Sequence, residues 1–423
     1  MSRLVGIRGW SFVIALSVGL VVVGSNIGRT NKWVASHLLF TYEDGFVRRA
    51  LIGSLIAAVA PGQEISTALA TGLGIAILAV FVIIASFLVS TAMSTHQAKV
   101  PVMMAGAILL ASGHTKTFAI DVGRFDIILV IASVLCGFAI LHSLRLGSMV
   151  ALVLGTAAVL VHENAVIVVF PLVVSMLVVR RSIDLKQSRD CGADGLSFAF
   201  ALLGMVVLTG AAVSLPTVAQ ETVDAAIERS GQRATFAPSA SAFSVQSSGL
   251  RENLVIMMDF WRDDAFPAAI VLLIALLPAA VIAWSAARSA HLPRVSLALL
   301  PPHATIDAPA LILAAASSPL LLMIVGVDYG RWTAITVANM AIAALWALSL
   351  SSPSLTGADR ASPELGRAAP EPGMRPLMLL AVIVAVALPA PTRTRATGLG
   401  FESDPTYPFL LMLRGLRDLL GPG

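Results

Sequence analysis

Long apolar segments, repeated along the chain, are the feature that most restricts how this sequence can fold. About eleven of them follow one another, at residues 10–27, 67–93, 100–113, 126–144, 148–161, 165–179, 196–215, 266–286, 308–327, 332–350 and 376–390. A helix of about 20 apolar residues is long enough to cross the hydrocarbon core of a bilayer. Because the backbone must satisfy its own hydrogen bonds there, helices are the expected spanning elements. The sequence therefore predicts an all-α, polytopic transmembrane helical bundle of about eleven spans.

The composition excludes ordinary soluble domains. Hydrophobic residues make up 57% of the 423 residues and charged residues only 12%, whereas a soluble domain carries about 25% charged residues. The net charge of +4 comes from basic residues scattered along the chain. We therefore expect membrane lipids as neighbours and no nucleic-acid partner. Cys136 lies in an apolar run and Cys191 in a basic loop, which indicates neither a disulfide framework nor a metal site.

Basic residues between the apolar segments indicate which loops face the cytoplasm. The loop 180–189 carries four Lys or Arg residues, and the positive-inside rule favours a cytoplasmic side for it. Counting all segments as crossings places this loop, the N-terminus and the loop 288–294 inside, whereas a single span at 148–179 would place one of these groups outside. We expect an integral protein of the bacterial cytoplasmic (inner) membrane, with a retained first span and a cytoplasmic N-terminus.

This assignment places the polar motifs on the outer face of a bundle that covers residues 1–391. The expected active-site loops are 28–66, 114–126, 162–164, 216–265 and 328–331. A short apolar helix at 47–60 is too short to span comfortably and is expected to lie in the membrane interface. Residues 223–233 in the longest loop read as a short amphipathic helix, and residues 392–423 as a C-terminal interfacial tail.

The densest charged motif is YEDGFVRRALIG in the first outer loop. Its adjacent carboxylates, Glu43 and Asp44, precede Arg48 and Arg49, which stand at the head of the short apolar helix. Arginine is the usual bidentate partner of phosphate, and a helix N-terminus adds partial positive charge. A neighbouring carboxylate is suited to act as a general base toward a hydroxyl. The alternative is a charged amphipathic loop whose acidic and basic side chains neutralise each other.

Two copies of a second pattern, IDVGRF and VDYGRW, each stand directly before an apolar segment. The first contains Asp121 and Arg124, and the second contains Asp328 and Arg331. Their i,i+3 spacing puts both charges on one face if the segment is helical. These pairs either contact a substrate or anchor helix ends at the membrane edge, with a snorkelling arginine and an interfacial aromatic ring.

His162, Glu163 and Asn164 interrupt an otherwise apolar stretch. They predict a turn that enters a polar cavity, because ionisable residues at membrane depth usually face the bundle interior. One His and one Glu are too few to claim a metal site. The sequence therefore requires no cofactor, and binding of a divalent metal is left as an alternative. Lys116 in GHTKTF is either a further phosphate contact or a solvated residue.

In this layout the chain resembles the GT-C superfamily, integral-membrane glycosyltransferases that use polyprenyl-phosphate sugars. The resemblance rests on YEDG in the first outer loop, IDVGRFD in the next, and the span count. It implies that Asp44 or Glu43 activates the acceptor hydroxyl and that Asp121 belongs to the second acidic motif. It also implies that the donor phosphate is held by basic residues such as Arg48, Arg49, Arg124 or Arg331. The acceptor stays open: an envelope glycan, a lipid or a protein.

Other functions also fit the sequence. It contains no Walker loop, dinucleotide fingerprint or nucleophile elbow, which disfavours ATP-driven work by this chain alone. A lipid-linked oligosaccharide polymerase or ligase would depend on arginine more than on Asp44. A transporter or flippase would hold polar residues at mid-depth. A structural subunit would use the ion pairs only to pin helix ends. Convergence of the polar motifs would favour chemistry, and dispersal around the rim would favour anchors.

Overall fold

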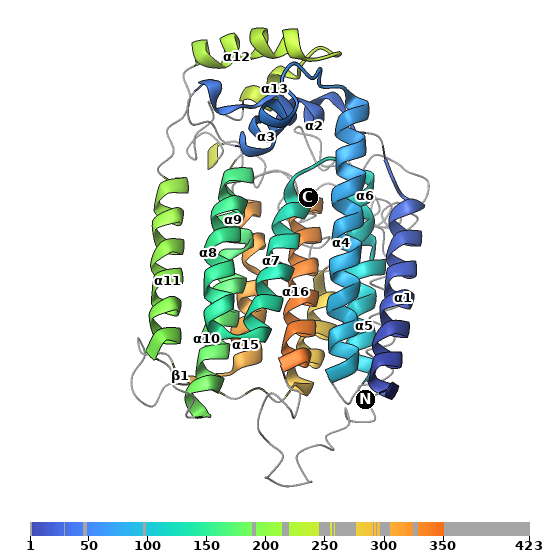
Figure 1. Cartoon of the computed structure of the whole chain (residues 1–423), viewed down its shortest axis with the longest axis vertical. Helices are drawn as coiled ribbons and strands as arrows, with labels where there is room; N and C mark the ends of the chain where they lie inside the picture. Colours follow the sequence, from blue (N-terminus) through green and yellow to red (C-terminus); the bar gives the residue numbers. More distant parts are fainter. Residues whose placement is uncertain are drawn as a thin grey trace, which may run out of the picture.

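The computed structural model is a bundle of upright helices with a smaller helical layer across one end (Figure 1). The structure describes residues 2–28, 30–44, 49–95, 99–187, 192–213, 220–244, 254–255, 258, 276–290, 292, 294–296, 305–324 and 329–350. Its helices are α1 (Ser2–Gly24), α2 (Lys32–Ser36), η1 (His37–Leu39), η2 (Tyr42–Asp44), α3 (Leu51–Val59), α4 (Thr67–Thr95), α5 (Lys99–Ala111), α6 (Gly113–Ile120), α7 (Asp126–His142), α8 (Leu144–Val161), α9 (Ala165–Val168), α10 (Phe170–Lys186), α11 (Gly192–Val213), α12 (Gln220–Arg233), α13 (Ala240–Ser244), α15 (Ala308–Ala316), η3 (Ser318–Ile324) and α16 (Tyr329–Leu350). Residues 276–289 are also helical. Two short strands, β1 (Val295–Ser296) and β2 (Thr305–Ile306), pair antiparallel.

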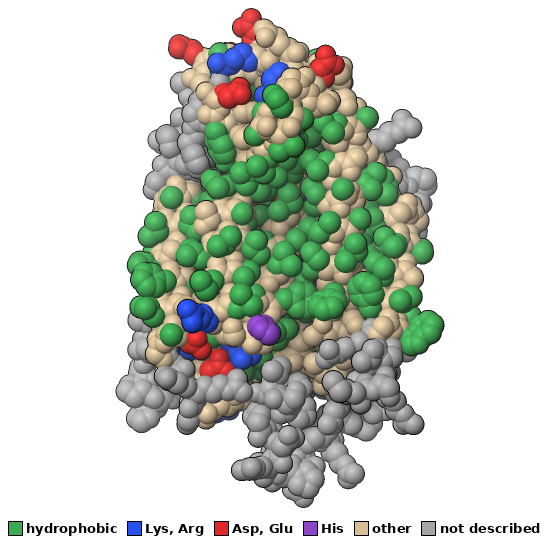
Figure 2. Space-filling model, viewed as in Figure 1, with side chains coloured by type: hydrophobic (Ala, Val, Ile, Leu, Met, Phe, Trp, Pro, Cys, Tyr) green, Lys and Arg blue, Asp and Glu red, His purple; other side chains and the backbone are tan. Residues whose placement is uncertain are grey.

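Several helices have the length and composition of membrane spans. In the described part of the chain these are Thr67–Thr95, Leu144–Val161, Ala165–Lys186, Gly192–Val213 and Arg331–Leu350. Shorter apolar helices accompany them at Gly9–Gly24, Asp126–His142 and Ala308–Ile324. Hydrophobic side chains cover the middle of the visible face, and charged side chains gather toward its two ends (Figure 2). The chain is therefore a polytopic helical membrane protein, as the sequence predicts.

The predicted total of about eleven spans is not settled by these helices. The expected segment 376–390, the linker before it and the tail 392–423 lie outside the described residues. The segment 266–286 is described only from residue 276, where a helix is present.

Helix α16 forms the centre of the bundle. Every residue from Trp332 to Leu350 is buried, and α16 packs against α4, α5, α6, α7 and α15. The indole Nε1 of Trp346 donates a hydrogen bond to the carbonyl oxygen of Gly137 on α7, at 3.1 Å. A span enclosed by other spans is positioned by protein contacts, so the residue that begins it, Arg331, is held in a defined place.

The ambiguous stretch 148–179 forms two antiparallel helices joined by a turn. Helix α8 ends at Val161 and α9 begins at Ala165, so the turn predicted at 162–164 is present. Between α9 and α10 the helix is broken near Pro171, which has no N–H to offer the carbonyl of Ile167. The Ser318 hydroxyl donates to that carbonyl, and Asn339 Nδ2 donates to the carbonyl of Val168 at 2.8 Å.

The first and fourth predicted outer loops form the layer across one end of the bundle. Helices α2, α3, α12 and α13 lie in this layer, and the N-terminus lies at the opposite end (Figure 1). The backbone N–H of Ser239 donates to Ser36 Oγ at 2.9 Å. The backbone of Ile65 forms a parallel β-bridge with Ala234. The described parts of these two loops therefore lie at the same end of the bundle, and α12 contains the amphipathic helix expected at 223–233.

The boundaries of two predicted segments differ from the structure. Ser112 caps a new helix by accepting a hydrogen bond from the backbone N–H of Thr115, so residues 113–120 are helical and the turn is confined to 121–125. Within the first loop, α3 begins at Leu51 rather than at residue 47. The Ser112 cap decides the first of these ends, and α3 begins after Arg49, whose φ of 62° is not that of a right-handed helix. Apolar patterning alone reveals neither end.

Candidate functional site

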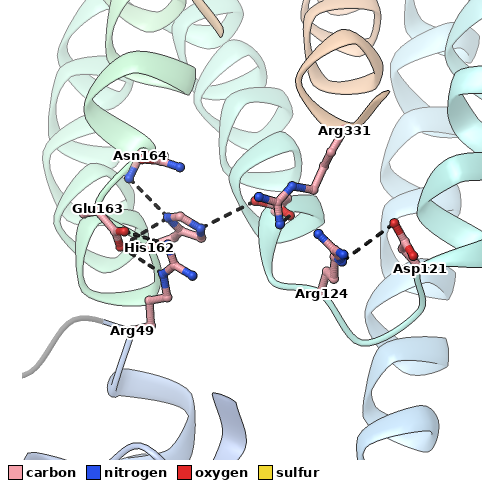
Figure 3. A network of polar contacts seen from close by, with 8 residues as sticks. Arg49, Asp121, Arg124, His162, Glu163, Asn164 and Arg331 are labelled. Atoms are coloured by element: carbon pink, nitrogen blue, oxygen red, sulfur yellow. Dashed lines mark hydrogen bonds and ion pairs between the residues drawn. The ribbon is translucent and has the colours of Figure 1, made fainter. Parts of the chain in front are cut away.

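Charged side chains from four separate segments meet at the end of the bundle that carries α2 and α3 (Figure 3). The segments are the turn just before α3, the turn between α6 and α7 with the first residue of α7, the turn between α8 and α9, and the start of α16. We call the set the polar network, and its members are Arg49, Asp121, Arg124, Asp126, His162, Glu163 and Arg331.

Arg49 and Glu163 join the first loop to the turn after α8. Arg49 Nη2 lies 2.7 Å from Glu163 Oε1, and Nε lies 3.2 Å from Oε2, so the guanidinium binds the carboxylate in a two-point fork. Burial would raise the pKa of Glu163, but the charges of Arg49 and His162 and their hydrogen bonds hold it well below the ordinary value. Glu163 is therefore ionised at neutral pH and acts chiefly as the partner that positions Arg49.

The backbone at Arg49 is strained. Its φ angle is 62°, in the left-handed region that non-glycine residues seldom adopt. Such conformations cost on the order of 1–3 kcal/mol and cluster at functional sites. The buried fork with Glu163 offsets this cost by fixing the side chain. The fold therefore holds Arg49 in a backbone conformation that arginine rarely adopts.

His162 and Asp126 continue the network toward α16. The backbone N–H of Asn164 donates to His162 Nδ1 at 3.2 Å, and that nitrogen also lies 3.3 Å from Glu163 Oε2. His162 Nε2 lies 3.7 Å from Asp126 Oδ1. Arg331 Nη1 lies 3.1 Å from the other oxygen of Asp126. Asp126, almost fully buried, links His162 to Arg331 and stands in the first turn of α7, where the helix dipole favours a negative charge.

Asp121 and Arg124 form the more open part of the network. Arg124 Nε lies 3.7 Å from Asp121 Oδ2, and about a fifth of each side chain is exposed. The Arg124 guanidinium also lies over the Trp33 ring, 5.2 Å from its centroid. Gly123 turns the chain here with a φ of +95°. An added Cβ would approach Thr30 and Val34 at 3.1 Å, so both the conformation and the packing require glycine.

The predicted site residues thus divide into three groups. Arg49, Asp121, Arg124, His162, Glu163 and Arg331 meet in the network, and Asn164 joins through its backbone N–H. Glu43 is exposed on η2, and Lys116 is partly exposed on α6; among the described residues neither forms an ion pair with the network. Arg48, Asp328 and the side chain of Asp44 lie outside the description.

Both copies of the Asp-x-Gly-Arg pattern contribute an arginine to the polar network. The Asp121–Arg124 pair predicted within the first copy is present. Arg331 of the second copy pairs with Asp126, the residue that follows the first copy. Arg331 also lies over the ring of Trp332, 4.5 Å from its centroid. The second copy is therefore joined to the start of α7 through the Asp126 carboxylate.

Two residues of the site were missed by sequence reasoning. Asp126 ends the motif IDVGRFD, and an acidic residue at the start of an apolar helix was a usable signal. His37 lies in the apolar stretch KWVASHLLF, which gives little indication of a site. It is buried on η1, and nearby charges of the network act on its imidazole.

The network combines three arginines with three carboxylates, and each arginine has a carboxylate within 4.0 Å. A neutral, paired set of this kind can admit an anion by exchange of carboxylate contacts for phosphate contacts, because arginine binds both with the same fork. Over the residues that are described, no group of three or more His, Cys, Asp or Glu side chains is arranged to hold a metal ion.

Searches against protein-family models, curated proteins and solved structures found no match for this chain. What the site does is therefore inferred from its residues and their positions.

Proposed function

We propose that the chain is a membrane glycosyltransferase that moves a sugar from a polyprenyl-phosphate donor to an envelope glycan, lipid or protein acceptor on the outer face of the cytoplasmic membrane. One observation carries this proposal. Arg49, Arg124 and Arg331 come from distant parts of the sequence, yet they meet in one network at one end of an apolar bundle. Helix-end anchors would have no need to converge in this way.

The arginines suit the phosphate of such a donor. A polyprenyl-phosphate sugar has an apolar tail, a phosphate at the membrane interface and a sugar beyond it. The tail would lie along the apolar helices, and the phosphate would meet Arg124 and Arg331 at their ends. When the sugar leaves, negative charge develops on the phosphate, and fixed guanidinium groups stabilise that charge. No nucleotide is needed for this reaction.

The general base is proposed to come from the first loop. Glu163 is a poor base, because its paired arginine holds its pKa well below the ordinary value. Asp126 is almost fully buried and is held by Arg331. Asp44 ends η2 in the layer above the network, next to the exposed Glu43. We assign the role of base to Asp44, with Asp121 as the residue that would take this role if Asp44 does not.

A transporter or flippase for a lipid-linked or anionic substrate is the second candidate. It is favoured by Asn339, a polar residue buried inside α16. Its Oδ1 has no hydrogen-bond partner among the described residues, and ionisable or polar groups at this depth often mark a substrate path. Its Nδ2, however, satisfies the freed carbonyl of Val168, which explains the residue structurally. Asn339→Leu should therefore reduce stability in an enzyme but abolish uptake in a transporter.

The test uses purified protein and a panel of radiolabelled undecaprenyl-phosphate sugars with a crude envelope fraction as acceptor. Wild type should transfer label from one donor, and folded Asp44→Asn should not. Transfer that survives Asp44→Asn removes Asp44 as the base and moves that role to Asp121. Absence of transfer from every donor, together with substrate uptake by reconstituted vesicles, would replace the enzyme with the transporter.

A further inference from the structure

His37 is a buried polar residue that the proposed reaction does not yet use. Only 5% of its surface is exposed. Its Nε2 is buried and has no hydrogen-bond partner within the described part of the chain. Buried polar atoms in native proteins are nearly always hydrogen-bonded, and an exception calls for an explanation such as a catalytic role or a missing ligand.

Aromatic side chains fix the position of this imidazole. The Trp33 ring meets it edge-on with centroids 4.3 Å apart, and Phe40 meets it at 5.3 Å. The same Trp33 ring also carries the Arg124 guanidinium. His37 and Arg124 therefore share one platform, and the imidazole is held beside the open part of the polar network.

Positive charge surrounds His37. Burial is the largest cause that lowers its pKa well below the ordinary value of 6.5, and the charges of Arg49, His162, Arg124 and Arg331 lower it further. These groups come from the first loop, the turn after α8, the turn before α7 and the start of α16. They are accompanied by the carboxylates of Glu163, Asp126 and Asp121. The imidazole is consequently neutral at neutral pH, with one N–H to donate.

We propose that His37 is a further ligand of the anion site, whose Nε2–H donates a hydrogen bond to an oxygen of the phosphate that the three arginines attract. This inference rests on the proposed function and names one more residue that recognises the donor phosphate. It accounts for the one polar atom of His37 that is buried without a partner, because the partner would be supplied by the substrate.

A pH dependence follows from this arrangement. A bound phosphate cancels part of the arginine field, so it raises the pKa of His37 relative to the free site. Binding then favours proton uptake, and affinity should increase as the pH falls toward the pKa of the bound state. A second histidine, His162, lies between Asp126 and Glu163 in the same network, so the effect must be measured against a variant without His37.

The experiment measures binding of farnesyl methyl phosphate to the purified full chain in nanodiscs. This diester keeps a single charge between about pH 5 and pH 8, where histidine titrates. His37→Phe keeps an aromatic ring against Trp33 and removes the donor, and we expect it to weaken binding about tenfold, as for one charge-assisted hydrogen bond. His37→Gln restores a donor and should stay within about threefold of wild type. His142→Phe, an exposed histidine at the far end of α7, is the matched control and should bind as wild type does.

Each outcome separates this inference from the proposed function. If His37→Phe binds as tightly as wild type with the same pH profile, the role of His37 is overturned, and loss of binding in Arg124→Gln would leave the phosphate site standing. If wild type does not bind the diester at all, both proposals fail. Should His37→Phe not fold, nitrogen-15 spectra of wild-type histidines decide: the Nε2 resonance of His37 must shift when the diester is added, and an unchanged resonance overturns the inference.

Discussion

Both ends of the bundle bury an arginine against a carboxylate, but they build these pairs in different ways. At the end opposite the network, Arg180 Nε lies 3.1 Å from Asp184 Oδ2, and both residues belong to α10. Arg180 Nη1 also donates to the carbonyl of Leu141 near the end of α7, at 3.0 Å. At the network end, Arg331 and Asp126 start two different helices.

The difference indicates which charges serve structure and which serve chemistry. A pair within one helix needs no tertiary fold to bring its members together, and it stabilises one contact between α10 and α7. Pairs between four segments exist only in the folded protein, and they place several arginines around one region. Shared burial is therefore a poor guide to function, whereas convergence of distant segments is a better one.

The largest expected effect is on stability, and it should be alike at the two ends. Asp126→Asn removes the charge that pairs with Arg331, and Asp184→Asn removes the charge that pairs with Arg180. Breaking a buried pair by removal of one partner costs about 3 kcal/mol or more. Thermal unfolding in detergent should show similar losses for both variants. A loss confined to one end would mean that the two pairs are not energetically equivalent.

The next largest effect should be on sugar transfer, and it should differ between the two ends of the bundle. Arg124 forms a loose ion pair with Asp121 and lies over Trp33, and Arg288 at the other end forms a loose pair with Asp307 and lies over Trp284. The exposed Arg288–Asp307 pair contributes less than about 1 kcal/mol, so Arg288→Gln should change the melting temperature little. Only about a fifth of the Arg124 side chain is exposed, so Arg124→Gln is assayed at an equal amount of folded protein. Sugar transfer should fall at least about tenfold only in Arg124→Gln. Equal activity in the two variants would remove Arg124 from the site.

A smaller effect should come from the strained backbone at Arg49. Arg49→Ala and Arg49→Gly both remove the fork with Glu163, but only glycine adopts a φ of 62° without strain. We expect the glycine variant to be more stable by about 1 kcal/mol, measured by chemical unfolding. If alanine is equally stable, the backbone relaxes in the variant and the strain is not imposed by the fold.

The smallest expected effect is on how the free energy of unfolding changes with pH in the acid range. The pKa of Glu163 in the folded protein lies well below its ordinary value of 4.5, so its pairing stabilises the fold above that pH and the contribution is lost as the pH falls through the folded pKa. The stability difference between wild type and Glu163→Gln should therefore shrink as the pH is lowered below about 4.5. A difference that stays constant through the acid range would show that Glu163 acts without its charge.

Much of the fold follows from features that the sequence displays locally. Apolar length predicts the spanning helices, and the polar interruption at 162–164 predicts the turn between α8 and α9. The i,i+3 spacing of Asp121 and Arg124 predicts their ion pair. In each case neighbouring residues carry the whole signal, so no knowledge of the tertiary fold is needed.

The remaining features of the site depend on contacts between distant segments. The partner of Arg49 is 114 residues away, and Arg331 pairs with a residue on another helix. His37 is distinguished by the arginines around it and by its buried Nε2, which has no hydrogen-bond partner among the described residues. Neither spacing nor composition records such neighbours, since helix packing brings them together.

The most direct measurement of the central claim compares Arg331→Gln with Arg180→Gln in the transfer assay, using the donor sugar that wild type accepts and equal amounts of folded protein. The two arginines are similarly buried and each holds a carboxylate at 3.1 Å. We predict that Arg180→Gln transfers sugar at nearly the wild-type rate and that Arg331→Gln loses transfer. Equal transfer by both variants would contradict the account, because the network would then be a structural clamp like the pair at the opposite end.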